Sequence, residues 1–298
     1  MCERKTFLND RCIVFGVEVF EMLYSEKYQQ EVWIFGGTRK YSINDCKNGI
    51  SLMEYLTTLL TLNNTNKFFD VFIEENYHWR NRYSPIGSAI NNDIIISIKN
   101  NLSKLNGNFQ LHLFGDIVLR QTDVKQYVEK LWSYVVNKDV NQYNNILDDT
   151  KKYFTDVNIM KQFLGIQDDN DINDGISKIP SKFILEAKII SDTYNKTKRG
   201  LLNAIAMDNK ILNNPTDYSS SIESIMNHLL DYLPILMYIR VFIKIFSNYD
   251  NNRTVKNAIF YGSRKYSNTI KGFLKRSGYI TLDRFENDLG CVFAPIPV

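Results

Sequence analysis

The chain has 298 residues, 44% hydrophobic and 13% aromatic, with 36 basic and 33 acidic side chains. This apolar fraction is typical of a folded protein and excludes an intrinsically disordered one. The formal charge of +3 is too small to indicate nucleic-acid or membrane binding through net charge alone. The length allows one large domain or two modest ones.

The amino-acid usage is unbalanced, with 33 asparagines against only 6 alanines. Asparagine, lysine, isoleucine and tyrosine have AT-rich codons, whereas alanine does not. We therefore attribute the asparagine excess to an AT-rich genome rather than to a prion-like or glycosylated design.

Neither the N-terminus nor the most apolar stretch predicts membrane targeting. The first residues, MCERKTFLNDRC, lack the apolar segment of a secretory signal. The stretch 229–246 contains Asp231, Arg240 and Lys244, so it predicts a buried helix rather than a bilayer span. We expect no membrane association.

Cysteine and histidine spacing predicts no zinc site and no cofactor. The histidines His78, His112 and His228 lie far apart, and no cysteine pair has the C-x-x-C spacing. Four cysteines in so long a chain do not make a disulfide scaffold, so a reducing intracellular compartment is the default. They are Cys2, Cys12, Cys46 and Cys291.

The first 136 residues alternate between strand and helix patterns. Val32–Phe35 predicts a buried strand that ends at Gly36-Gly37, and Ser51–Leu62 predicts a helix with a capping box of Ser51 and Glu54. The same alternation continues with a strand at 68–73, a helix at 93–105, a strand at 109–114 and a helix at 124–136. This order favours a parallel sheet with helical crossovers.

The middle of the chain predicts helices, at 143–154, 179–196, 200–212 and 221–246. Gln167–Gly175 breaks the ligand pattern of a calcium loop, and we interpret it as a solvated loop. The α/β pattern then returns, with a strand at 257–261, a helix at 268–276 closed by Gly278, and a last strand at 279–282.

We therefore predict a single α/β domain over residues 1–298, with a parallel or mixed sheet. The sheet is expected from about 30–136 and 255–292, and an α-helical insertion from about 140–250.

A short motif occurs twice, each time after a predicted strand. The copies are Gly37-Thr38-Arg39-Lys40-Tyr41-Ser42 and Gly262-Ser263-Arg264-Lys265-Tyr266-Ser267. Because ligands bind at the carboxyl edge of open α/β sheets, one hypothesis is an anion site that binds phosphate or carboxylate between the two R-K-Y-S loops. Its residues would be Arg39, Lys40, Tyr41, Arg264, Lys265 and Tyr266.

A second interpretation pairs the arginines with acids at neighbouring strand ends. Glu74 and Glu75 follow one predicted strand, and Asp116 follows another. Cations placed among these carboxylates need no ligand. The basic stretch Lys271–Arg276, with Tyr266 and Phe273, could contact a nucleic-acid backbone, but a solvated helix face is the preferred reading.

The order of motifs resembles a group of uncharacterised proteins of large DNA viruses, of the mimivirus type. More remotely it resembles the erythromycin-esterase and TraB/ChaN-type α/β proteins, which carry a Gly-Glu-x-His motif after the first strand and a histidine after the late strand. In this chain the first motif falls on Gly36-Gly37-Thr38-Arg39 and the late one on Tyr261 to Tyr266, without glutamate or histidine. Because arginine cannot serve as a general base, the resemblance implies an inactive copy.

The sequence therefore predicts a non-enzymatic viral protein on a degenerate hydrolase-like scaffold, acting by binding or assembly with a viral or host protein. One alternative is an RNA- or phosphate-binding factor that supports viral gene expression. Another is a metal-assisted hydrolase that uses Glu74, Glu75 and Asp116. The host cytoplasm or viral factory is the expected location. The sequence leaves open whether the protein is packaged in the virion, whether it forms homo-oligomers and whether Cys46 and Cys291 form a disulfide.

Overall fold

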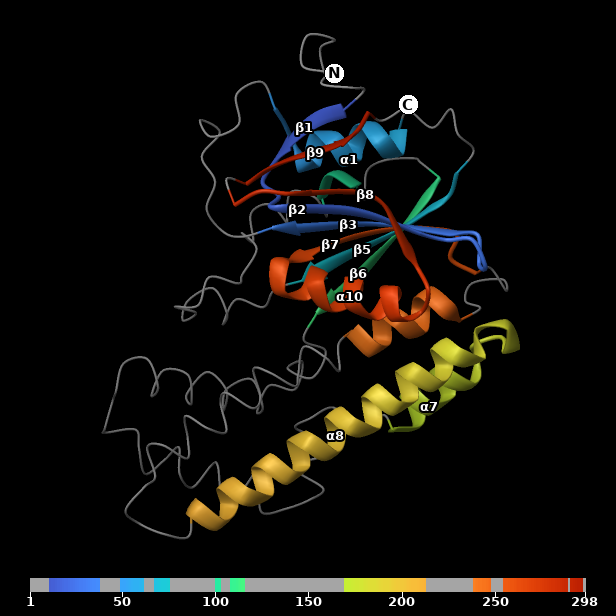
Figure 1. The fold of residues 1–298 in the computed structure, drawn as a ribbon, viewed down its shortest axis with the longest axis vertical. Coiled ribbons are helices and arrows are strands. Elements are labelled where there is room, and N and C mark those ends of the chain that lie inside the picture. Colours follow the sequence, from blue (N-terminus) through green and yellow to red (C-terminus); the bar gives the residue numbers. More distant parts are fainter. Residues whose placement is uncertain are drawn as a thin grey trace. The chain divides into compact units, whose positions relative to one another are not determined.

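The computed structural model describes residues 11–37, 49–61, 67–75, 100–102, 108–115, 169–212, 238–247, 254–288 and 290–296. The chain divides into two compact units, one made of residues 1–115 and 254–298, the other of residues 116–253. Mixed parallel and antiparallel sheets combined with helices confirm the α/β fold class (Figure 1). The helices predicted at 124–136 and 143–154 lie outside the described residues.

The first unit contains a six-stranded sheet in the order β6-β5-β7-β3-β2-β8. Strands β3, β7, β5 and β6 run parallel, and β2 is antiparallel to both β3 and β8. All the strands predicted between 32 and 261 are present, and each is longer than its sequence pattern. The bounds are β2 Val19–Ser25, β3 Gln30–Gly37, β5 Phe69–Glu75, β6 Phe109–Gly115, β7 Asn257–Ser263 and β8 Ile280–Glu286.

A second sheet has the order β4-β1-β9 and was not expected. Its strands are β1 Arg11–Phe15, β4 Ile50–Ser51 and β9 Cys291–Pro295. No strand was predicted for residues 11–25, where Arg11, Glu18 and Glu21 interrupt the apolar run. Both of these acids have buried side chains in the folded chain: Glu18 is 6% exposed and Glu21 is 0% exposed.

Helix α1, Leu52–Thr61, follows β4 and begins at the predicted capping box. The Ser51 hydroxyl accepts a hydrogen bond from the Glu54 amide at 3.1 Å, and the Glu54 carboxylate accepts one from the Ser51 amide at 2.9 Å. These reciprocal bonds satisfy two helix-end donors. The capping-box prediction is therefore confirmed.

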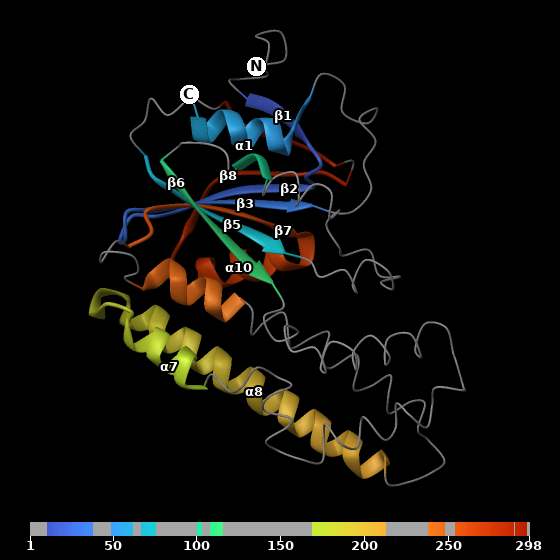
Figure 2. The same ribbon diagram turned by 180° about the vertical axis from the view of Figure 1, so that it is seen from behind.

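Helices α1 and α10 lie on opposite faces of the six-stranded sheet (Figures 1 and 2). Helix α10, Arg264–Arg276, begins directly after β7, earlier than predicted, and its last turn runs into Gly278 at φ +86°. Strand β3 leads through α1 toward β5, whereas the adjacent β7 leads through α10 toward β8. Because β3 leads to a helix on one face of the sheet and β7 to a helix on the other (Figures 1 and 2), we take the carboxyl ends of β3 and β7 as the topological switch point of the sheet.

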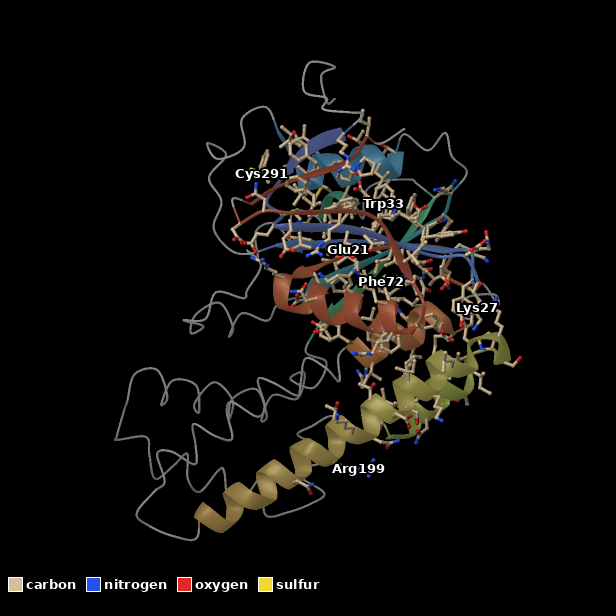
Figure 3. All side chains as sticks on the ribbon, viewed as in Figure 1. Glu21, Lys27, Trp33, Phe72, Arg199 and Cys291 are labelled. Carbon is tan, nitrogen blue, oxygen red and sulfur yellow. The ribbon has the colours of Figure 1, made fainter. Side chains whose placement is uncertain are left out.

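The two faces of the six-stranded sheet differ in chemistry. Alternate strand residues pack with α1 in an apolar cluster that includes Trp33, Phe35 and Tyr55. The residues between them point to the α10 side and include buried Glu21, Asp70 and Glu74. Figure 3 labels Trp33 on the first face and Phe72 on the second.

The second unit is described through helix α7 Asp169–Ser177, a 3₁₀ turn at Ser181–Phe183, helix α8 Ile184–Leu212, and helical residues 238–246. The solvated-loop prediction for 167–175 is wrong, because most of that segment belongs to α7. Ile172 is buried, and a Cβ at Gly175 would lie 2.9 Å from the Ile243 side chain. The segment is therefore helical despite its polar composition, because Ile172 is buried and Gly175 packs closely against Ile243.

Helix α8 also corrects the prediction of separate helices at 179–196 and 200–212. One continuous helix of 29 residues passes through Gly200 without a break. A glycine inside a helix costs only about 1 kcal/mol relative to alanine, which a long helix can absorb. Within the described ranges, no helix combines the length and apolar character needed to cross a membrane.

Candidate functional site

The two copies of the repeated motif begin side by side at the switch point. In the parallel ladder of β3 and β7, Gly36 is opposite Gly262 and Gly37 is opposite Ser263. The folded sheet therefore brings together two segments that are more than 200 residues apart in the sequence. Of the six predicted anion-binding residues, Arg39, Lys40 and Tyr41 lie outside the described residues, and Lys265 and Tyr266 are placed only by backbone.

The glycines at this edge face protein atoms rather than open space. A Cβ at Gly36 would lie 2.8 Å from the Ser267 hydroxyl oxygen of α10, and one at Gly37 would lie 2.8 Å from the Gly16 carbonyl oxygen. A Cβ at Gly262 would meet the Phe260 ring at 2.8 Å. These glycines allow helix and strands to pack closely, which is a sufficient physical reason for their presence.

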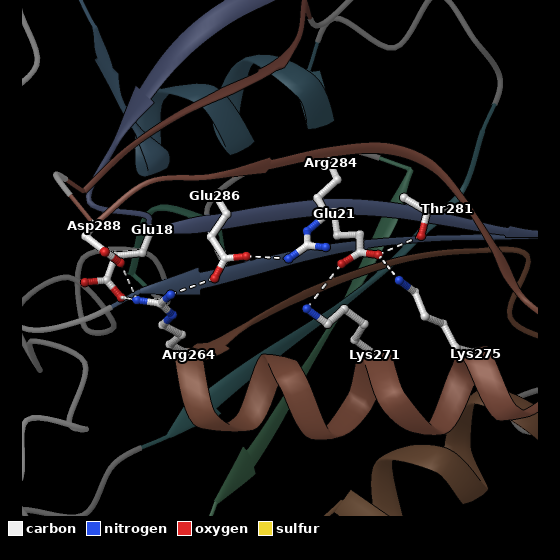
Figure 4. Close-up of polar contacts among 9 residues, drawn as sticks. All are labelled: Glu18, Glu21, Arg264, Lys271, Lys275, Thr281, Arg284, Glu286 and Asp288. Carbon is white, nitrogen blue, oxygen red and sulfur yellow. Dashed lines mark hydrogen bonds and ion pairs between the residues drawn. The ribbon is translucent and has the colours of Figure 1, made fainter.

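Arg264 is the first residue of α10, and its guanidinium lies among three carboxylates (Figure 4). It donates hydrogen bonds to Glu286 and Asp288, both at 2.6 Å, and forms an ion pair with Glu18 at 3.7 Å. The hydrogen bonds to Asp288 and Glu286 raise the pKa of Arg264 above its ordinary value. This arginine is therefore fixed by acids of the protein itself.

The ion pairs found for Arg264 involve different acids from those proposed from the sequence. Its partners are Glu18, which directly precedes β2, and Glu286 and Asp288 at and after the end of β8, not acids of β5. Glu74 is buried at the end of β5, with Oε2 3.1 Å from a Cβ built at Gly262. The side chain of Glu75 and the whole of Asp116 lie outside the described residues.

A second charged group lies further along α10 (Figure 4). Glu21 is completely buried and is contacted by Lys275 at 2.6 Å, Lys271 at 3.4 Å and the Thr281 hydroxyl at 2.7 Å. Burial pushes the pKa of Glu21 upward, but the hydrogen bonds from Lys275 and Thr281 and the charge of Lys271 outweigh it. The pKa therefore lies below its ordinary value, and the carboxylate is ionised at neutral pH.

Glu286 joins two arginines on the same face. Arg284 donates a hydrogen bond to one Glu286 oxygen at 2.5 Å, and Arg264 donates to the other at 2.6 Å. The Arg284 bond, followed by the Arg264 bond, lowers the pKa of Glu286. The charges along this face of α10 thus neutralise one another within the protein.

Sequence reasoning missed most of this charged face. Lys271 and Lys275 are four residues apart and share one side of α10, a spacing that could have indicated a common acidic partner. Both lysines contact the buried Glu21: the Lys271 side chain is only 17% exposed, whereas the Lys275 side chain stays 39% exposed, as expected of a solvated helix face. Phe273 is 1% exposed, so it cannot stack on a base in this conformation.

A buried histidine–aspartate pair lies on the same face of the sheet, between β5 and β6. His112 Nε2 is 2.9 Å from Asp70 Oδ1, and the imidazole stacks on Phe72 with ring centroids 4.7 Å apart. Both side chains are buried, at 4% and 0% exposure. Asp70 therefore satisfies the buried imidazole within the described part of the sheet.

Metal ligands are not grouped in the part of the chain that the structure describes. No cluster of three or more histidine, cysteine, aspartate or glutamate side chains there could hold an ion.

No protein-family model matches the chain, and neither a curated protein nor a solved structure matches it. The resemblance to proteins of large DNA viruses therefore stays a prediction.

Proposed function

We propose that this chain is a non-enzymatic viral protein that acts by binding or assembly with a protein partner. One observation carries the proposal. Arg264 lies in the late motif, which lacks the histidine that the resemblance implies, and its guanidinium is held by Glu286 and Asp288 at 2.6 Å, with Glu18 nearby. A permanently charged guanidinium cannot accept a proton, so Arg264 cannot serve as a general base.

The packing of the glycine edge supports the same conclusion. Phosphate sites at switch points use glycines so that the ligand can approach the backbone. Here the space beside Gly36, Gly37 and Gly262 is taken by Ser267, the Gly16 carbonyl and Phe260. At this edge the glycines pack closely against neighbouring protein atoms, and Arg264 is bonded to carboxylates of the same chain.

The alternative of RNA or phosphate binding is favoured by one feature, the register of β3 and β7. That register starts both R-K-Y-S segments at neighbouring positions of the sheet edge, although the second segment forms the first turn of α10 and not the predicted loop. The charge balance of α10 argues against this alternative, because Arg264, Lys271 and Lys275 each contact a carboxylate. Cations that are paired in this way have less to gain from a phosphate.

Binding and catalysis can be separated with the purified full-length chain and two variants, Glu74→Gln and Arg264→Met. We expect no hydrolysis of ester or phosphoester substrates with Mg²⁺, Mn²⁺ or Zn²⁺ by any of the three proteins. Hydrolysis by the unmodified chain that Glu74→Gln abolishes, with the circular dichroism spectrum unchanged, would establish the hydrolase instead.

RNA binding is tested by titrating a single-stranded RNA oligonucleotide at low and at moderate salt. We expect no saturable binding, whereas salt-sensitive binding that Arg264→Met weakens would establish the nucleic-acid alternative. For the protein partner, crosslinking in infected cells identifies candidates, and each is then mixed with the purified chain. A complex of fixed stoichiometry supports the proposal, and failure of every candidate to reassemble contradicts it.

A further inference from the structure

The small sheet β4-β1-β9 contains two described cysteines, and both are in disulfide bonds. Cys12 lies in β1 and Cys291 is the first residue of β9. None of the described cysteines is free. The sequence analysis expected a reducing compartment, where such bonds are rare.

The register of β1 and β9 shows that these two cysteines are not bonded to each other. In this antiparallel ladder Cys12 is opposite Ala294, and Cys291 is opposite Phe15. The positions of Cys12 and Cys291 differ by three residues along the ladder, which separates their Cα atoms by about 10 Å. The Cα atoms of a disulfide-bonded pair lie at most roughly 7 Å apart.

The faces of the small sheet lead to the same conclusion. Cys12 and Ala294 are buried on one face, whereas Phe15 and Cys291 are partly exposed on the other. Side chains three positions apart point to opposite sides of a strand, so the two sulfur atoms point away from each other.

We propose that the chain contains two disulfide bonds, with Cys12 in one and Cys291 in the other. The sequence holds only four cysteines, so the partners are Cys2 and Cys46 in one of two arrangements. Each bond forms when two thiols lose two protons and two electrons. A disulfide-bearing thiol oxidase accepts these, and its own disulfide becomes two thiols. The protein therefore matures in contact with a thiol-oxidising system.

Peptide mapping of the full-length chain tests the pairing directly. Trypsin places the four cysteines on four different peptides, 1–4, 12–27, 41–47 and 285–298. After free thiols are blocked under denaturing conditions, we expect no labelled cysteine and two linked pairs, with 12–27 and 285–298 in separate pairs. A direct link between peptides 12–27 and 285–298 overturns the proposal. Free thiols that react with the blocking reagent in protein produced together with a thiol oxidase also overturn it. So does a disulfide-linked dimer on a non-reducing gel.

The variants Cys12→Ser and Cys291→Ser provide an independent readout that does not need the whole map. If the cysteines belong to different bonds, each variant retains one intramolecular disulfide and frees one thiol outside the β1–β9 ladder. If the two were bonded to each other, Cys12→Ser would leave the thiol of Cys291 free to react with the blocking reagent. Labelling of 285–298 in Cys12→Ser would therefore contradict the proposal even if both variants lost stability.

Discussion

The two faces of the six-stranded sheet are built from the same strands but are stabilised in different ways. On the α1 face, Phe20, Phe35 and Tyr55 pack ring against ring, with centroids 5.1 and 5.8 Å apart. On the α10 face, Glu21 is as fully buried as those rings but depends on Lys271 and Lys275. The α1 face is therefore stabilised by apolar area, whereas the α10 face combines apolar side chains such as Ile34 and Phe273 with a buried acid whose charge must be matched.

The two faces should therefore differ in how much stability a substitution costs. An apolar core loses stability in proportion to the atoms removed and to the cavity left behind. A buried charge network responds to the loss of a single partner, because the remaining charge stays desolvated. The predictions that follow test this contrast, beginning with the largest effect.

Removing an aromatic ring from the α1 face should be the most damaging change. Phe35→Ala deletes a side chain that is 0% exposed and contacts both Phe20 and Tyr55. We expect a loss of about 4 kcal/mol in the free energy of unfolding, measured by urea denaturation. The control Phe35→Leu should lose clearly less, and equal losses would show that the cavity does not determine the cost.

Neutralising the buried acid on the α10 face should have an intermediate effect. Glu21→Gln keeps the shape but removes the charge that Lys275 and Lys271 contact, so we expect a loss of about 2 kcal/mol by urea denaturation. The matched control is Glu286→Gln, whose side chain is 30% exposed, and it should cost less than about 1 kcal/mol. A larger loss for Glu286→Gln would contradict the role of burial.

The charge network also predicts a pH dependence of stability. The pKa values of Glu21 and Glu286 are lowered in the folded chain, from an ordinary value of 4.5. Their contribution is therefore complete above that value and is lost as the pH falls through the folded pKa values below it. The stability difference between the unmodified chain and Glu21→Gln should shrink when urea denaturation is repeated from about pH 7 to about pH 3. A constant difference would contradict an ionised Glu21.

The smallest effect is expected at the exposed end of the network. The Asp288 side chain is 83% exposed, although its hydrogen bond with Arg264 is only 2.6 Å long. Solvent screening should leave Asp288→Asn within about 0.5 kcal/mol of the unmodified chain in the same urea assay. A loss near that of Glu21→Gln would mean that geometry matters more than burial on this face.

The sequence predicted the parallel strands well because each contains a dense apolar segment. Val32–Phe35 is apolar throughout, and Phe69–Ile73 contains a single polar residue, Asp70; both segments are buried, which gives a strong local signal. Strand β2 was missed because Glu21 lies within it, and nothing local shows that two lysines some 250 residues later will compensate that charge. The partners of Arg264 were misassigned for the same reason, since β2 and β8 had not been placed beside α10.

The position of the candidate site in the sheet was easier to predict than the contacts that its side chains make. Motifs after two strands indicated the carboxyl edge, and the pairing of Gly36 with Gly262 brings those motifs together. The ion pairs of Arg264 depend on Glu18, Glu286 and Asp288, whose positions follow from tertiary structure alone.

The place of β7 in the strand order has a consequence during synthesis on the ribosome. This strand separates β3 from β5, yet it is translated after them and after the whole of residues 116–253. A nascent chain that has emerged only to residue 253 therefore exposes the hydrogen-bonding edges of both β3 and β5, and such edges invite pairing with other chains. Pairing across so many residues is also slow. Completion of the sheet must await synthesis of β7, and until then the exposed edges of β3 and β5 favour aggregation of the newly made chain.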